Sequence, residues 1–165
     1  MDKSIWKPRP YQASDREACL RILDGNSPQS FLPNERESFS KYLDEHAAGY
    51  YVVENAKGIL AACGGFSLGL DGESATLCWG MVDKAFHGKG LGRLLLSRRL
   101  AALAQIPGMK LIRMDTSQNS VGFFMKRGFK TYRITRDHYG PDLHRYEMYL
   151  LLDEEKRKEI LNFNF

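Results

Sequence analysis

Cysteine is scarce in this sequence of 165 residues, and the three cysteines do not have the spacing of a metal or disulfide motif. Cys19, Cys63 and Cys78 form no CxxC pair, and each lies in an apolar run, which is typical of buried thiols in a reducing compartment. The four histidines form no HExxH motif. We therefore expect neither a disulfide framework nor a metal cofactor.

Long apolar runs are also missing. No run approaches the ~20 residues that a membrane helix needs, and the polar start lacks the apolar stretch of a secretion signal. We therefore expect a cytoplasmic protein with no membrane partner. Hydrophobic residues make up 43% and charged residues 27%, which argues against disorder and suits one globular domain. We expect this domain over residues 1–152, followed by a charged C-terminal extension over residues 153–165.

The charge balance is mildly basic, with 24 Lys and Arg against 20 Asp and Glu. The positive residues are scattered, apart from clusters within residues 89–99 and 126–136. A nucleic-acid-binding protein usually shows a longer basic stripe, whereas a small anionic ligand needs only a local patch. We therefore expect a small anionic ligand and no nucleic acid.

Hydrophobic periodicity and turn residues predict an alternation of strands and helices. We expect strands over residues 5–12, 50–54, 59–67, 74–82, 111–116, 130–136 and 145–152, and helices over residues 14–23, 35–45, 90–105 and 120–127. Ser14 and Glu17 have the spacing of a capping box. The central strand, long helix and strand imply a right-handed crossover with a parallel pair. The order β-α-α-β-β-β-α-β-α-β-β thus predicts a mixed α/β (α+β) fold, with a mostly antiparallel sheet and helices on both faces.

The most informative segment is a glycine-rich turn between the strand ending at Val82 and the long helix, which reads His87-Gly88-Lys89-Gly90-Leu91-Gly92-Arg93. Alternate glycines permit backbone conformations denied to other residues and let a ligand approach the main chain. Their N–H groups converge with the donors of the first helical turn, and Lys89 and Arg93 add charge, so phosphate is the expected guest. The spacing excludes the P-loop and the dinucleotide fingerprint. A plain strand-to-helix turn is the alternative.

This turn resembles the signature of the GNAT superfamily of acyl-CoA-dependent N-acetyltransferases, [Gln/Arg]-x-x-Gly-x-[Gly/Ala] after a strand ending in Val. A second family motif, a strand and a short helix closed by Gly-Phe, is matched by residues 111–116, residues 117–124 and Gly128-Phe129. The predicted element order follows the family across residues 5–152. The resemblance implies a GNAT-like fold with a splayed parallel pair, and acetyl-CoA as co-substrate.

The sequence departs from the family pattern at several positions. His87 stands where Gln or Arg is usual, and Lys84 stands where Pro is common. Phe124 replaces the family tyrosine. The family asparagine aligns with Ser117, while Asn119 lies two residues later.

The resemblance also implies where acetyl-CoA binds. Its diphosphate would lie on residues 87–92, its pantetheine arm would pair with the main chain of residues 80–82, and an amide near Met81 would polarise the thioester. Phe123 and Phe124 would pack against the pantetheine, although core packing is the alternative for both. The expected cofactor-binding residues are Gly80, Met81, Val82, His87, Gly88, Lys89, Gly90, Leu91, Gly92, Arg93, Asn119, Phe123 and Phe124.

By the same resemblance the acceptor is a primary amine, on a small molecule or a peptide, held by the segments 24–35 and 137–145. Glu35 is the expected catalytic base or ammonium anchor, although an acid at a helix start also complements the helix dipole. The oligomeric state is left open, and a homodimer is one partner that the family allows.

Phe124 has no hydroxyl, so the family tyrosine's role as proton donor to the leaving thiolate is vacant or has moved to another residue. Ser117, Ser120, Tyr132 and Tyr139 are the substitutes, and we favour Tyr139 as a catalytic residue for its expected place in a loop. Asp115, a strand-end acid, is more often structural. The missing hydroxyl also motivates an alternative function, a non-catalytic acyl-CoA-binding or regulatory module.

Overall fold

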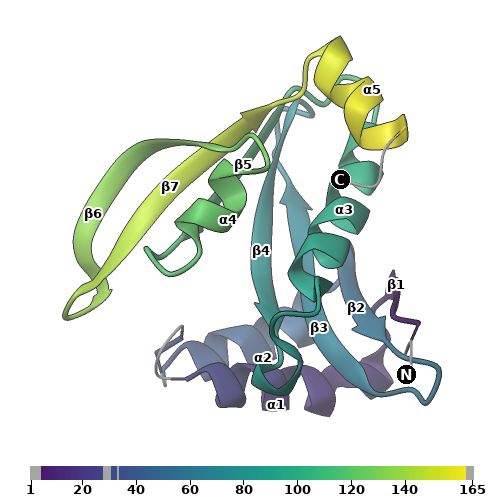
Figure 1. Ribbon diagram of the computed structural model, residues 1–165, viewed down its shortest axis with the longest axis vertical. Coiled ribbons are helices and arrows are strands. Elements are labelled where there is room, and N and C mark those ends of the chain that lie inside the picture. The colour runs from purple at the N-terminus through teal and green to yellow at the C-terminus, as the bar shows by residue number, and fades with distance from the viewer. Residues whose placement is uncertain (1–4, 28–30, 33, 163–165) are drawn as a thin grey trace. The chain divides into compact units, whose positions relative to one another are not determined.

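A computed structural model describes residues 5–27, 31, 32 and 34–162 (Figure 1). The strands are β1 (Lys7–Pro10), β2 (Tyr50–Glu54), β3 (Leu60–Leu68), β4 (Ser74–Val82), β5 (Leu111–Thr116), β6 (Lys130–Gly140) and β7 (Leu143–Leu151). The helices are α1 (Arg16–Asn26), α2 (Glu35–Glu45), α3 (Leu91–Ala104), α4 (Val121–Met125) and α5 (Glu154–Asn162), with short 3-10 turns η1 (Ala13–Asp15) and η2 (Lys84–Phe86). The predicted order of strands and helices is confirmed, and α5 follows it.

The strands form a seven-stranded sheet in the order β1-β2-β3-β4-β5-β7-β6. β4 and β5 are parallel, whereas β1–β2, β2–β3, β5–β7 and β6–β7 are antiparallel. The parallel pairing joins Ser74–Thr76 to Leu111–Arg113, which is a short part of the nine-residue β4. The mixed, mostly antiparallel sheet that the sequence predicted is confirmed.

The chain forms two compact units. The first unit is Met1–Phe66, Trp79–Arg99, and the second is Ser67–Cys78, Leu100–Phe165. α5 belongs to the second unit, where Ile160 is buried and the Arg157 guanidinium donates to the carbonyl oxygens of Ala104 and Met109. The extension is thus helical over Glu154–Asn162, and the single domain over residues 1–152 stays a prediction.

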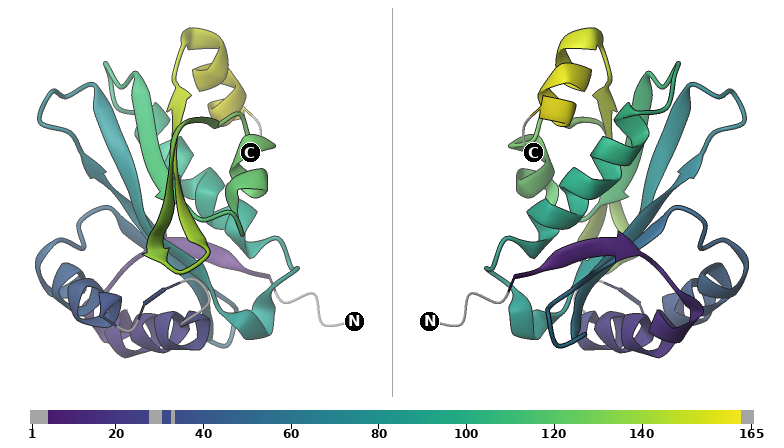
Figure 2. Two further views of the ribbon diagram at one scale, coloured as in Figure 1. Left: turned by 90° about the vertical axis from the view of Figure 1, so that its left-hand side faces the viewer. Right: turned by 90° about the vertical axis from the view of Figure 1, so that its right-hand side faces the viewer.

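Within the first unit, helices cover both faces of the strands. Val52, Cys63 and Met81 pack into one core cluster with residues of α1 and α2, which run side by side (Figure 2). Successive strand residues face opposite sides, so Gly64 faces α3, where a Cβ on it would lie 3.0 Å from Leu95 Cδ2. The predicted placement of helices on both faces therefore holds in this unit.

The start of α1 differs from the prediction. The capping box is formed by Gln12 and Asp15 rather than by Ser14 and Glu17, with the Gln12 N–H donating to Asp15 Oδ2 at 2.8 Å. Asp15 is drawn inward because Arg9 donates to both of its carboxylate oxygens, at 2.8 and 2.9 Å. Burial raises the pKa of this carboxyl, but the bonds from Arg9 and Gln12 outweigh burial and hold it below its usual value.

The segment 137–145 of the second unit is mostly strand, so its prediction as a loop was wrong. β6 runs to Gly140 and β7 begins at Leu143, which leaves a tight turn in which Asp142 has a φ of +55°. The Asp142 N–H donates to Asp137 Oδ1 at 2.7 Å and the Asp137 N–H to His144 Nδ1 at 3.0 Å. These hydrogen bonds hold the end of the hairpin, where the sequence has no hydrophobic alternation that would predict strands. No helix in the described part of the chain is long and apolar enough to cross a bilayer.

Candidate active site

β4 is distorted near its end, because Trp79 has a φ of +49°. A positive φ in a bulky residue is rare and costs about 1–3 kcal/mol unless the surroundings hold it. Here the Tyr50 hydroxyl donates to the Trp79 carbonyl at 2.9 Å, and the Phe39 ring centroid lies 5.0 Å from the Trp79 ring. The distortion immediately precedes Gly80 and Met81, which were predicted to lie at the thioester.

The carbonyl oxygen of Val82 binds two side chains where β4 ends. Asn26 Nδ2 donates to it at 2.9 Å, and His87 Nε2 lies 2.9 Å from it. A carbonyl oxygen can only accept, so Nε2 carries the hydrogen in this contact. The His87 ring therefore braces the turn after β4, and the His87 main-chain N–H donates to the Lys84 carbonyl within that turn.

The glycine-rich turn has the conformation of an anion-binding nest. Gly88 and Gly90 both have a φ of +77°, which residues with a Cβ rarely adopt. A Cβ on either glycine would have no heavy atom of the described residues within 4 Å, so the space beside the turn is open. α3 begins at Leu91, and the first N–H groups of a helix have no partner inside it. These are the main-chain conditions for holding an anion.

Two cations flank this turn. Lys89 and Arg93 are exposed, and Lys89 Nζ lies 5.4 Å from the ring centroid of Phe86. The Phe86 ring packs in turn against Trp6, with 5.1 Å between the centroids. Positive side chains beside main-chain donors raise the local potential, which favours a multiply charged guest such as a diphosphate.

Glu35 opens α2, and its carboxylate also serves the helix start. The Leu32 N–H donates to Glu35 Oε2 at 2.7 Å, a bond typical of an acid in a first helical turn. Glu35, Phe39 and Tyr42 are spaced to share one side of α2, and the two rings lie 5.0 and 6.4 Å from the Trp79 ring. A carboxylate has further lone pairs for a bound ammonium. Residues 28–30 and 33 of the predicted acceptor segment lie outside the described residues.

In the second unit, Tyr139 and Asp115 form a hydrogen-bonded pair. The Tyr139 hydroxyl donates to Asp115 Oδ2 at 2.8 Å, and Arg145 Nε lies 3.0 Å from the same oxygen. Tyr139 lies in β6 rather than in a loop. Asp115, which we expected to be structural, therefore accepts the hydrogen bond of Tyr139, which we expected to be catalytic.

A second carboxylate, Glu147, is linked to this pair through Arg145, and sequence reasoning missed it. Glu147 is 5% exposed. Arg133 Nη2 donates to Glu147 Oε1 at 2.7 Å, and Arg145 Nη2 lies 3.4 Å from the same oxygen. The hydrogen bond from Arg133 holds the pKa of Glu147 below its usual value. The available signal was a single acid in the otherwise apolar stretch of β7.

The second family motif is packed by its own side chains. Arg127 Cζ lies 3.7 Å from the ring centroid of Phe123, and the Phe124 and Phe129 centroids are 5.6 Å apart. Asn119 is exposed in the turn before α4. These contacts suit a local structural role for both rings.

The predicted site residues are thus divided between the units. Glu35 and the set from Gly80 to Arg93 lie in the first unit, whereas Asn119, Phe123, Phe124 and Tyr139 lie in the second. Among the described residues, no group of three or more His, Cys, Asp or Glu side chains could hold a metal ion.

Comparison with known proteins supports the interpretation of the two motifs. Residues 46–131 match the family model described as an acetyltransferase (GNAT) domain. A search of curated proteins found no match.

Three solved structures illustrate the likeness of fold. The ribosomal-protein-S18-alanine N-acetyltransferase of Escherichia coli has a TM-score of 0.76 at 20% identity, covering 90% of this chain and 95% of that one. A spermidine N-acetyltransferase variant from Vibrio cholerae has a TM-score of 0.72 at 17% identity, and the match covers 95% of this chain and 96% of that one. The N-acetylglutamate synthase of Neisseria gonorrhoeae was solved with coenzyme A and N-acetylglutamate. It has a TM-score of 0.72 at 18% identity, and the match covers 93% of this chain and 36% of that one.

The fold, the two motifs and the extent of the family match lead to one assignment. The matched residues make up about half of the chain and contain the end of β4, the glycine-rich turn and α3. The family uses acyl-CoA and acts on amines. This chain belongs to the GNAT acetyltransferase family.

Proposed function

We propose that this chain transfers the acetyl group of acetyl-CoA to a primary amine, by direct attack within a ternary complex. The observation that carries the proposal is the open turn at the start of α3, where Gly88 and Gly90 share a φ of +77°. The diphosphate of acetyl-CoA would be held by the amides of residues 88–93, with Lys89 and Arg93 adding charge.

The reaction needs a deprotonated amine and a polarised thioester. The amine nitrogen attacks the carbonyl carbon, the carbonyl electrons move to oxygen, and collapse of this intermediate forms the amide and releases the CoA thiolate. The main chain at Gly80–Val82 would hold the pantetheine as an added strand, and the Met81 N–H would stabilise the developing oxyanion.

Two proton transfers complete the scheme. An aliphatic amine with a pKa near 10.4 is mostly protonated at neutral pH, so Glu35 is our candidate for anchoring the ammonium and receiving its proton. Tyr139 is our candidate donor to the thiolate, and its single hydroxyl hydrogen would turn from Asp115 Oδ2, to which it is bonded here, toward the sulfur. Phe123 and Phe124 remain our candidate contacts for the pantetheine, and Asn119 remains a candidate cofactor-binding residue.

One observation favours a second candidate function. Phe124 lacks the hydroxyl of the tyrosine that the family has at this position, and its ring packs against Phe129. A chain that binds acyl-CoA without turning it over would serve as a sensor or a regulatory module.

The deciding experiment measures binding and turnover separately. Acetyl-CoA affinity is measured by calorimetry, and CoA release is followed with a thiol reagent across small amines, spermidine, and peptides with a free N-terminal alanine or a lysine. The polyamine and the N-terminal alanine are included because structural neighbours are named for such acceptors. We expect binding and amine-dependent thiol release. Binding with silence across the panel would favour the non-catalytic module, and no binding would overturn both functions.

A further inference from the structure

A buried arginine lies directly behind the end of β4. Arg99 of α3 is 4% exposed, although it occupies a helix otherwise rich in leucine. It is one turn beyond Leu95 and faces the same strands. Charged side chains are almost never buried to this extent, so the placement of this cation calls for a physical reason.

Two glycines in neighbouring strands make the space for its guanidinium. A Cβ on Gly80 would lie 3.1 Å from Arg99 Nη2 and 3.2 Å from Nη1, and a Cβ on Gly64 would lie 3.3 Å from Cζ. Arg99 Nη1 also donates to the Gly65 carbonyl at 3.4 Å. The guanidinium therefore lies close to the main chain of β3 and β4.

The same part of β4 is reachable from outside. Gly80 is exposed, whereas Arg99 is buried. Gly80 is therefore a residue that is open to solvent and close to the buried cation. Trp79, the preceding residue, has its positive φ at this point, so a distorted backbone and a buried positive charge coincide.

We propose that Arg99 is an electrostatic positioning residue, whose buried charge stabilises the oxyanion formed when the thioester is attacked beside Gly80–Val82. This inference rests on the proposed function. A fixed charge in a low-dielectric interior acts more strongly than one in water and needs no reorganisation during the reaction. It also accounts for a cation where an apolar side chain would pack with equal or better stability.

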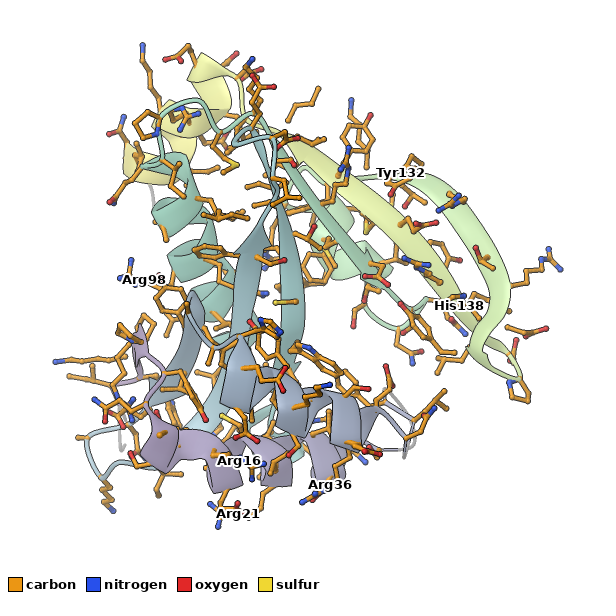
Figure 3. The ribbon with its side chains drawn as sticks, turned by 180° about the vertical axis from the view of Figure 1, so that it is seen from behind. Arg16, Arg21, Arg36, Arg98, Tyr132 and His138 are labelled. Carbon is orange, nitrogen blue, oxygen red and sulfur yellow. The ribbon has the colours of Figure 1, made fainter. Side chains whose placement is uncertain are left out.

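The test uses charge removal, charge retention and a matched control in the full chain. Arg99→Gln keeps hydrogen-bond donors but removes the charge, and Arg99→Lys keeps the charge. Arg98→Gln is the control, because Arg98, labelled in Figure 3, is the neighbour on α3 and its Cζ lies 5.0 Å from the Tyr51 ring rather than against β4.

The first measurement is the infrared stretch of the acetyl carbonyl in bound acetyl-CoA labelled with 13C at that carbon, which needs no acceptor. In the unaltered chain we expect this stretch at lower frequency than in water. Arg99→Gln should shift it back up, whereas Arg99→Lys and Arg98→Gln should not. With the fastest amine of the panel, Arg99→Gln should lower kcat by roughly tenfold to a hundredfold, with the KM for acetyl-CoA changed less than threefold.

The outcomes are distinct. Equal carbonyl frequency and equal kcat in Arg99→Gln and the unaltered chain would overturn the proposal. So would a loss of folding in both Arg99 variants, seen by thermal unfolding, because Arg99 would then serve the fold alone. If the unaltered chain bound no acetyl-CoA, the proposed function itself would fail.

Discussion

At the scale of single residues, the backbone of the turn before α3 decides which side chains it tolerates. Gly88 and Gly90 adopt a left-handed conformation that places successive N–H groups on one side. The sequence predicted this feature because glycines at alternate positions before a helix indicate a backbone that side chains with a Cβ would strain. The sequence could not predict the contact of His87 with the Val82 carbonyl, because it does not determine the rotamer of the His87 side chain.

Gly90→Val should weaken acetyl-CoA binding by about tenfold or more, because a β-branched residue at a φ of +77° is strained by roughly 1–3 kcal/mol. Relief of that strain moves the amides. Calorimetry gives the affinity. Gly58→Val is the matched control, since Gly58 has a φ of +76° and also faces open space among the described residues. Equal loss in both variants would mean that the turn is no anion site.

Tyr139→Phe should lower kcat by up to about a hundredfold, because the proton donor to the thiolate is removed, while the KM for acetyl-CoA stays unchanged. Tyr132→Phe tests the other tyrosine that the sequence left open as the donor; Tyr132 is 52% exposed and packs against Tyr149, so we expect its rate unchanged. Phe124→Tyr should keep or raise the rate. Full activity in Tyr139→Phe would assign the proton to another group or to water.

At the scale of elements, the sequence predicted some boundaries to the residue and missed others. α2, β2, β4 and β5 begin and end as expected, because a change of periodicity or a turn residue marks each end. The hairpin of β6 and β7 is longer than expected, since its distal part is exposed and carries no hydrophobic alternation. Polar contacts hold this part of the hairpin in place of hydrophobic packing, and they produce no periodic pattern in the sequence.

The start of α1 gives a pH-dependent prediction. The folded pKa of Asp15 lies below its usual value, so its stabilisation is fully present above pH ~4 and is lost as the pH falls through the folded pKa. At pH 6, Asp15→Asn should lower the free energy of unfolding by about 1–3 kcal/mol. The difference between the two chains should shrink as the pH falls from 5 to 2, measured by urea unfolding.

Asp44→Asn provides the comparison for that series. Asp44 accepts from Arg16 at 2.8 Å, but its side chain is 56% exposed. Exposed ion pairs contribute little to stability, so this variant should unfold almost as the unaltered chain does at pH 6. A larger loss in Asp44→Asn than in Asp15→Asn would contradict our account of the buried pair.

At the scale of the whole molecule, the fold and the cofactor motif were predictable, whereas the polar groups behind them were not. The order of strands and helices along the chain, the parallel pair and the glycine-rich turn follow from local patterns. The guanidinium of Arg99 lies close to Gly64 and Gly80, which belong to two strands, and Arg133 donates to Glu147 across the β6–β7 hairpin. Such contacts depend on tertiary placement, which periodicity does not encode.

Ligand binding should be visible in the stability of the whole chain. Acetyl-CoA at about one hundred times its Kd should stabilise the native state by about 2.7 kcal/mol and raise the Tm by roughly 5–11 °C. S-acetylpantetheine, which lacks the diphosphate, should raise the Tm far less at the same concentration. Equal shifts with both ligands would remove the glycine-rich turn from the binding site.

The close approach of Arg99 to two glycines also couples the substitutions that these positions can accept. A methyl group on Gly80 would lie 3.1 Å from Arg99 Nη2, so the guanidinium would have to shift by a few tenths of an ångström. A shorter side chain at position 99 would relieve this approach, whereas a methyl group on Gly64 would still lie 3.0 Å from the Gly80 Cα and from Leu95 Cδ2. The effect of a substitution at position 80 on stability should therefore depend on the residue at position 99.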